Sequence, residues 1–309
     1  MDVLSPPAPA TTTGGVARWF DSRRAFAGWA FASLVGNILI VVSGAVVRLT
    51  DSGLGCPTWP QCSTGSYVPR SAVNHHSLIE FGNRLITFVL IFLAVATIVS
   101  AIRSHAARHE RWLAWYAVAG IPLQGVVGGI TVLSKLNPWV VALHLLLSVW
   151  LITVLTRLVM LTRGVRPDAA PASLRRLVSL LFWVLMLAVW LGTVVTGAGP
   201  NSGDAGVARN HLDIETVARV HALSVWVAVG LTGIVLIQAH RRGHARMARW
   251  ATWLLGAELV QGAIGYAQYF LGLPTWLVIC HMTGIGLVVV AAAWLWFGVA
   301  RPRPVSAPA

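Results

Sequence analysis

Long runs of apolar residues, separated by short polar connections, dominate the chain. A helix needs about 20 such residues to cross roughly 30 Å of hydrocarbon, and eight runs are long enough. The pattern therefore predicts an all-α polytopic membrane protein with eight transmembrane helices. The predicted spans are residues 26–47, 77–101, 113–133, 139–161, 177–198, 216–239, 250–271 and 276–299.

Part of this pattern is repeated. Gln124 precedes His144 by 20 residues, and Gln261 precedes His281 by the same number. Val-Val-Ser/Thr-Gly-Ala likewise occurs at 41–45 and again at 194–198. Because each repeat holds four spans, both copies have the same orientation, and two pseudo-symmetric four-helix bundles are predicted.

The repeat divides the chain into five predicted parts. They are a cytoplasmic N-terminal tail (1–25), a first four-helix half (26–161), a cytoplasmic linker (162–176), a second four-helix half (177–300) and a cytoplasmic tail (301–309).

Composition supports a membrane protein with no sizeable soluble domain. Only 11% of the 309 residues are charged, whereas a soluble domain has about 25%. The net charge of +13 comes from arginines in alternate connections, which is the positive-inside pattern rather than a nucleic-acid surface. It predicts a plasma-membrane protein with both termini in the cytoplasm.

Three histidines lie inside predicted spans at a similar depth, towards the outer side: His144, His221 and His281. Polar residues in a membrane are costly, so they are functional candidates. His221 and His281 belong to the second and fourth helices of one bundle. Two facing imidazoles there could ligate a haem iron from both sides. A hydrogen-bonded structural role is the alternative for each histidine.

The first half differs at one place. His144 corresponds to His281, but alignment of residues 80–84 with 218–222 puts Asn83 at the position of His221. Asparagine is a poor iron ligand, so the first pocket has one strong ligand and an open face, which suits a substrate. Glu80 has no acidic counterpart and could serve as a general base or stabilise charge. An ion pair with Arg84 is compatible with either role.

Other polar residues have two interpretations each. Gln124 and Gln261 begin a Gln-Gly-x-x-Gly segment that favours close helix packing, or they contact a bound macrocycle. Arginines near the outer span ends could bind haem propionates or reach lipid headgroups: Arg48, Arg84 and Arg219. Histidines in or near outward loops are solvated, or one replaces the ligand lacking at Asn83: His75, His76 and His211.

The chain has three cysteines. Cys56 and Cys62 lie in the first outward loop, where an oxidising exterior favours a disulfide. Two free thiols or a metal-binding pair are the alternatives. We expect Cys280 to be a buried small apolar residue.

These residues resemble the haem A synthases, which convert haem O to haem A for cytochrome oxidase. The resemblance covers residues 26–300 and is carried by residues 44–62, which contain Gly-Leu-Gly-Cys-Pro-Thr-Trp-Pro, by residues 80–84 and by the three span histidines. It implies haem b at His221 and His281, the substrate haem O at His144, and a functional acid at Glu80. It also implies a cysteine pair at Cys56 and Cys62.

The family commonly has histidine where this chain has Asn83. This departure leaves open whether His144 alone holds haem O or whether a loop histidine replaces the second ligand.

The implied activity is that of an oxidoreductase acting on a CH group. A ring methyl becomes a formyl group through hydroxylation-level steps, with haem b relaying electrons. The implied partners are haem O, a haem O synthase as its supplier and the lipid bilayer. The sequence leaves the electron acceptor open, and also whether the chain forms a homo-oligomer. The alternatives are a dihaem b-type electron-transfer subunit and a haem transporter or chaperone without chemistry.

Overall fold

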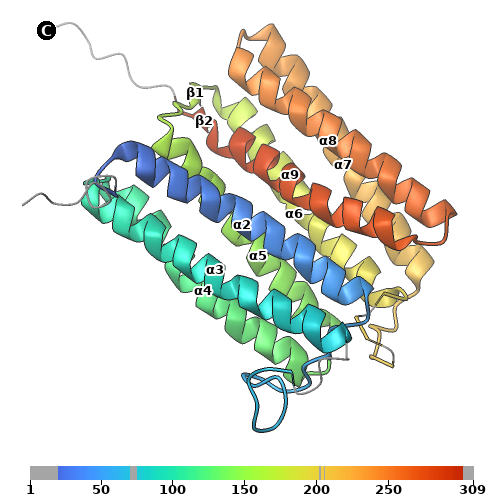
Figure 1. Ribbon diagram of the computed structural model, residues 1–309. Helices are drawn as coiled ribbons and strands as arrows, with labels where there is room; N and C mark the ends of the chain where they lie inside the picture. Colours follow the sequence, from blue (N-terminus) through green and yellow to red (C-terminus); the bar gives the residue numbers. More distant parts are fainter. Residues whose placement is uncertain (1–19, 70–74, 202, 205, 302–309) are drawn as a thin grey trace, which may run out of the picture.

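The computed structural model describes residues 20–69, 75–201, 203–204 and 206–301 (Figure 1). Eight long helices and two short strands make up the regular structure of these residues. The helices are α2 (Arg23–Leu49), α3 (His75–Arg103), α4 (Arg108–Leu133), α5 (Pro138–Thr162), α6 (Ala172–Ala198), α7 (Ile214–Arg241), α8 (Ala245–Phe270) and α9 (Thr275–Phe297). Each predicted span coincides with one helix. The predicted tails lie largely outside the described residues.

Several helices begin at residues whose side chains satisfy the free backbone N–H groups of the first turn. Ser22 caps α2 by accepting from the N–H of Ala25, and Asn137 caps α5, whose first residue is Pro138. Asp213 accepts from Thr216 at the start of α7, and this bonding holds the pKa of Asp213 below its usual range. These local signals set where α2, α5 and α7 start.

The helices form two groups of neighbours. Helices α2 to α5 pack as a closed ring of four, and α6 to α9 pack as a second ring. Figure 1 shows α3 and α4 at one edge and α7 and α8 at the other, with α2, α5, α6 and α9 meeting between them. The predicted two-fold relation between the halves, and the five predicted parts of the chain, remain predictions.

Each group encloses its own hydrophobic core. Phe26, Ile121 and Leu155 belong to the first core, and Phe182 and Leu254 belong to the second. Val289 of α9 packs within the first core, so the two cores adjoin across the central helices.

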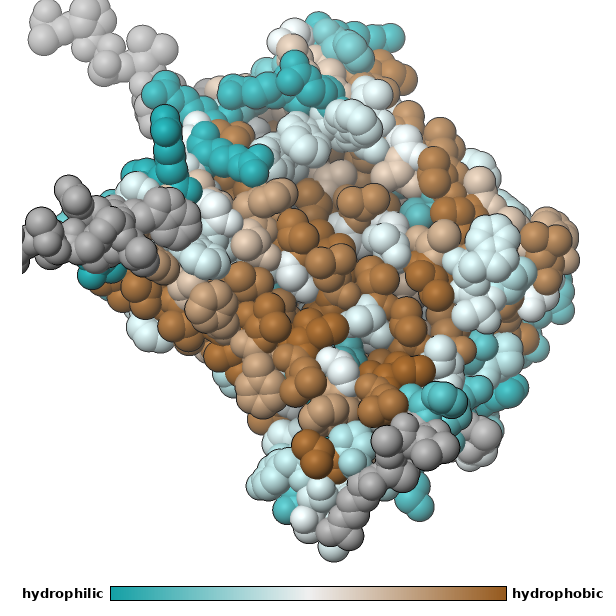
Figure 2. All heavy atoms as spheres, viewed as in Figure 1, coloured by the Kyte–Doolittle hydropathy of each residue, from teal (hydrophilic) through white to brown (hydrophobic). Residues whose placement is uncertain are grey.

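Seven helices are long and apolar enough to cross a membrane. In Figure 2 brown side chains cover the middle of the visible face, and teal side chains gather at its ends. The helix that fails this criterion is α8, which contains the predicted span 250–271. The reason lies in its sequence, since Glu258 and Gln261 occupy its middle. The structure thus confirms a multi-pass protein, whereas α8 as the eighth span remains a prediction.

Contacts at both ends tie the halves together. The linker predicted at 162–176 contains strand β1 (Asp168–Ala169), which pairs in parallel with β2 (Val299–Ala300) after α9. At the other end, Arg48 of α2 donates through Nε to the carbonyl of Asn201 at 2.5 Å. The first outward loop also joins the second half, because the N–H of Gly53 donates to the carbonyl of Gly203 at 2.9 Å.

Candidate functional site

The three span histidines occupy equivalent depths in their helices. His144, His221 and His281 follow the first residues of α5, α7 and α9 by six, seven and six positions. Their positions along the helices are therefore equivalent, and one shared depth in the membrane stays a prediction.

Each of these imidazoles lies against a glycine of the preceding helix. A Cβ atom added at Gly128 or at Gly192 would lie 3.3 Å from Cε1 of His144 or His221, respectively. One added at Gly265 would lie 3.8 Å from Cε1 of His281. The glycines thus make room for the rings, and this explains a feature that sequence reasoning assigned only to helix packing.

The hydrogen bonding of His221 suits a metal ligand. Its Nδ1 lies 3.0 Å from the carbonyl oxygen of Ala188, which can only accept, so Nδ1 carries the proton. The lone pair is then on Nε2, and such a second partner is typical of a ligating histidine. His221 and His281 lie on α7 and α9, which occupy opposite corners of the second ring of helices.

The other two rings lack such a partner. Nδ1 of His144 and Nδ1 of His281 are buried without a hydrogen bond from the described residues. In the same part of the chain, no three His, Cys, Asp or Glu side chains form a metal-binding group. Haem iron takes one or two protein ligands, so the imidazoles present fit a haem better than a bare metal ion.

Asn83 is held by its own half. Ser43 of α2 donates from Oγ to Oδ1 of Asn83 at 2.6 Å. The repeat that relates Ser43 to Thr196 also places Leu39 where α6 has Gly192. The first half therefore lacks both the fourth histidine and the glycine that would make room for it.

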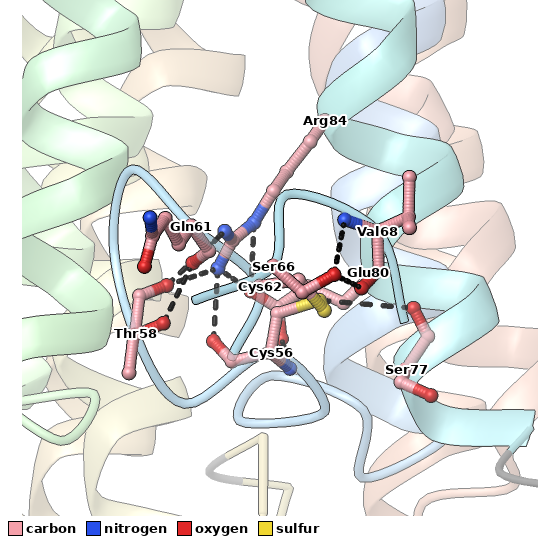
Figure 3. The surroundings of a disulfide bond; sticks show 9 residues. All are labelled: Cys56, Thr58, Gln61, Cys62, Ser66, Val68, Ser77, Glu80 and Arg84. Atoms are coloured by element: carbon pink, nitrogen blue, oxygen red, sulfur yellow. Dashed lines mark hydrogen bonds and ion pairs between the residues drawn. A yellow bond between two sulfur atoms is a disulfide. The ribbon is translucent and has the colours of Figure 1, made fainter. Parts of the chain in front are cut away.

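Glu80 and Arg84 of α3 form the polar centre around which the loop between α2 and α3 folds (Figure 3). Oε1 of Glu80 accepts from Nη2 of Arg84 at 2.5 Å, and Oε2 accepts from the N–H of Cys56 at 2.6 Å. Arg84 also donates to the carbonyls of Cys56, Thr58 and Gln61. The ion pair considered from the sequence is present, and Arg84 is committed to the loop rather than free for a propionate.

A disulfide between Cys56 and Cys62 closes this loop, so the free-thiol and metal-pair alternatives are wrong. The same loop reaches α4, the helix whose Gly128 faces His144. A Cβ added at Gly129 would collide with the indole of Trp59, and Gly129 follows the glycine that faces His144. Through these contacts Glu80 and Arg84 hold a loop that packs next to the His144 region.

The two repeated glutamines differ in their partners. Gln124 donates from Nε2 to Oγ of Ser148 at 2.7 Å, and Ser148 donates to the carbonyl of His144. Gln261 lies directly against Gly284, three residues after His281. Oε1 of each glutamine is buried without a partner among the described residues. Both amides therefore lie near the histidine turns, and each keeps one unused acceptor.

The remaining candidates have mainly structural contacts. Arg48 binds backbone carbonyls of the second half, as described above, and Arg219 pairs with Glu215 at the surface. His76 contacts Oγ of Ser52 through Nδ1 at 3.1 Å, and His75 and His211 are exposed. Cys280, expected to be buried, is exposed, because its side chain points outward from α9.

Sequence reasoning missed one buried acid inside a predicted span. Glu258 of α8 is 3% exposed, and its Oε1 lies 2.9 Å from the hydroxyl of Thr232 on α7. The signal was present in the sequence, since Glu258 is the one acidic residue between positions 216 and 299.

Comparison with known proteins shows the family of the chain. The family model of the cytochrome oxidase assembly proteins, COX15-CtaA, matches residues 27–293. The chain belongs to this family. Among COX15-CtaA relatives, the heme A synthase of Shewanella oneidensis is 32% identical over 59% of this chain and 58% of its own length. The heme A synthase of Exiguobacterium sibiricum is 27% identical over 82% of this chain and 90% of its own length.

A third relative is larger. The protoheme IX farnesyltransferase of Thermus thermophilus is 28% identical over 88% of this chain but only 47% of its own length. The chain thus spans about half the length, or less, of some curated relatives that it matches.

Proposed function

We propose that this COX15-CtaA protein is a haem A synthase that oxidises the ring methyl of haem O to a formyl group. The observation that carries the proposal is the contrast between the halves. The second half has a histidine in each of two opposite helices of its ring, whereas the first half has one such histidine, Asn83 in place of the other, and a buried carboxylate paired with Arg84. A two-haem electron carrier needs no such difference.

In this proposal the halves hold different haems. His221 and His281 ligate haem b, which supplies a one-electron redox centre when bound. His144 binds the iron of the substrate haem O on one side. Asn83, whose amide oxygen is engaged by Ser43, leaves the other side open.

Glu80 acts on the methyl group in this scheme. Each hydroxylation-level step adds an oxygen from water and releases two protons and two electrons, and the electrons would pass to an external one-electron acceptor. A gem-diol then loses water to give the aldehyde. Glu80 positions or deprotonates that water. The oxygens of Glu80 already accept from Arg84 and from the N–H of Cys56. These two contacts hold the carboxylate against the loop that packs near the proposed haem O site.

Topology and partners follow from charge and from the relatives. The positive-inside rule places both termini in the cytoplasm of a plasma-membrane protein, with the histidines towards the outer side. Residues 26–161 and 177–300 form the two halves, related by an approximate two-fold axis, and α8 is the eighth span. The farnesyltransferase relative supports a haem O synthase as the supplier of substrate.

The test is co-expression with a haem O supply, followed by extraction and identification of the pigments. We expect haem A from the wild-type chain and loss of most haem A from Glu80→Gln, with both haems still bound. Glu110→Gln is the matched control, because Glu110 is also buried and paired with an arginine, Arg23. Haem B alone would indicate an electron carrier, unchanged haem O a binding protein, and full haem A from Glu80→Gln would refute the role of Glu80.

A further inference from the structure

Glu258 differs from the other buried acids of the described chain. Glu80, Glu110 and Glu258 are 5%, 4% and 3% exposed. Glu80 pairs with Arg84 and Glu110 with Arg23, but no cation pairs with Glu258 in the part of the chain that the structure describes. An isolated carboxylate in such a place is strongly disfavoured, so the neutral acid is the stable form.

The hydrogen bonds of Glu258 point to the same form. The hydroxyl of Thr232 lies 2.9 Å from Oε1 of Glu258 and 3.0 Å from the carbonyl of Ala228. A hydroxyl has a single hydrogen to donate. Thr232 cannot give its one hydrogen fully to both acceptors, whereas a protonated Glu258 that donates to Thr232 lets Thr232 donate to Ala228. Oε2 of Glu258 is buried without a described partner, so a second polar contact is available to it.

Glu258 shares its helices with the histidine pair. Thr232 lies on the same helix as His221, and α8 carries both Glu258 and Gly265, the glycine that faces His281. Seven residues of α8 separate these positions, or about 10 Å along the axis. Gln261 lies between them on the same helix and places its amide against Gly284 of α9.

The first half has no such site. The repeat relates Glu258 to Ile121 and Thr232 to Ala94, and these two residues are 2% and 1% exposed in the first core. In the first half, the apolar residues Ile121 and Ala94 therefore fill the place that corresponds to Glu258 and Thr232, and both are fully packed. The carboxyl group is consequently a property of the half that contains the two imidazoles.

We propose that Glu258 is a proton-binding site linked to the redox state of the second half. The inference rests on the proposed binding of haem b by His221 and His281. If a bound haem b lost one electron to a one-electron acceptor, its positive charge would increase and Glu258 would release one proton to bulk water. When the electron returns, Glu258 binds a proton again. Because nearby charges interact strongly in a medium of low dielectric constant, this exchange keeps the net charge of the half constant.

Few other groups can compete for this role. Helices α7 and α9 pack against α8. Their ionisable residues lie near the ends, with Glu215, Arg219, His221, Cys280 and His281 towards one side and His240 and Arg241 at the other. Between those ends, Thr232 is the polar residue that contacts Glu258.

The experiment is an equilibrium redox titration of the purified, haem-loaded full chain at several pH values. We expect the midpoint potential of the wild-type haem b to fall by about 59 mV per pH unit over the range in which Glu258 exchanges one proton per electron. Glu258→Gln and the double variant Thr232→Ala, Glu258→Ile, which copies the first half, should lose this slope. Glu258→Asp, which keeps the carboxyl group, should retain it.

Equal slopes in the wild type and Glu258→Gln, with haem bound to both, would overturn the role of Glu258 and leave the proposed function intact. A folded chain that binds no haem would overturn both. Infrared spectroscopy of the wild-type protein tests the proposed protonation of Glu258 without any substitution. The infrared difference between oxidised and reduced wild-type protein should contain the carbonyl band of a carboxylic acid, and absence of that band would refute the proposal.

Discussion

The first half, near the start of α3, and the second half, in the middle of α8, each hold a buried carboxyl group, but the partners of the two groups differ. Glu80 is paired with Arg84 and with a backbone N–H of a disulfide loop. Glu258 has a threonine hydroxyl as its hydrogen-bond partner and lies deep between helices. The comparison shows that repeated helices have acquired different polar chemistry: a charged network beside an outer loop in one half, and a single acid beside a histidine pair in the other.

Loss of a ligand in the second half should have the largest effect. We expect His281→Ala to lower the amount of haem b retained by at least about tenfold, since even partners of metal ligands contribute 10- to 100-fold to binding. The haem-to-protein ratio, measured by absorption, checks this. His211→Ala removes an exposed histidine and should change nothing. Full retention of haem b by His281→Ala would place that haem elsewhere.

Removal of an arginine tests the difference between buried and exposed ion pairs. Glu80–Arg84 and Glu215–Arg219 have the same i,i+4 spacing near the starts of α3 and α7, but only the first is largely buried. Arg84→Ala should lower the free energy of unfolding by about 3 kcal/mol because it leaves a buried carboxyl group unpaired. Arg219→Ala should cost less than about 1 kcal/mol. Denaturant titration in detergent measures both, and equal losses would contradict the assignment.

A fourth histidine tests why the first half has one ligand. We expect Asn83→His alone to bind the first-half haem iron weakly, because Leu39 takes the place that Gly192 has beside His221. Combined with Leu39→Gly, it should convert most of that haem to a low-spin, two-ligand form. Electron paramagnetic resonance distinguishes the spin states. A complete conversion by the single variant would show that Leu39 is not an obstacle.

The smallest effect concerns two glycines of the second half. An added methyl group at Gly192 would lie 3.3 Å from the ring of His221, whereas at Gly265 it would lie 3.8 Å from that of His281. Gly192→Ala must therefore displace the ring, and we expect a cost of about 1 kcal/mol, or roughly fivefold in haem affinity. Gly265→Ala should bind haem normally. Haem titration of the two variants provides the comparison, and a reversed order would contradict the packing described.

Much of the architecture could be predicted because it depends on local composition. The eight apolar runs predicted the eight helices, and the depth of the three histidines follows from their positions in those runs. The cysteine pair and the Glu80–Arg84 pair are close in sequence, so their association was also predictable. The polar residues of α8 are visible in the sequence. The burial of Glu258 could not be predicted, because it depends on how α8 packs against other helices.

Contacts between distant residues could not be predicted in this way. Trp59 meets Gly129, Arg48 meets Asn201, and Glu80 meets the N–H of Cys56, and none of these pairs shares a helix or a pattern. A run of apolar residues specifies a helix because length and hydrophobicity act along a single segment. The partner of a polar atom depends instead on how separate helices and loops pack, since each buried donor or acceptor must find a group that the chain brings to it in space.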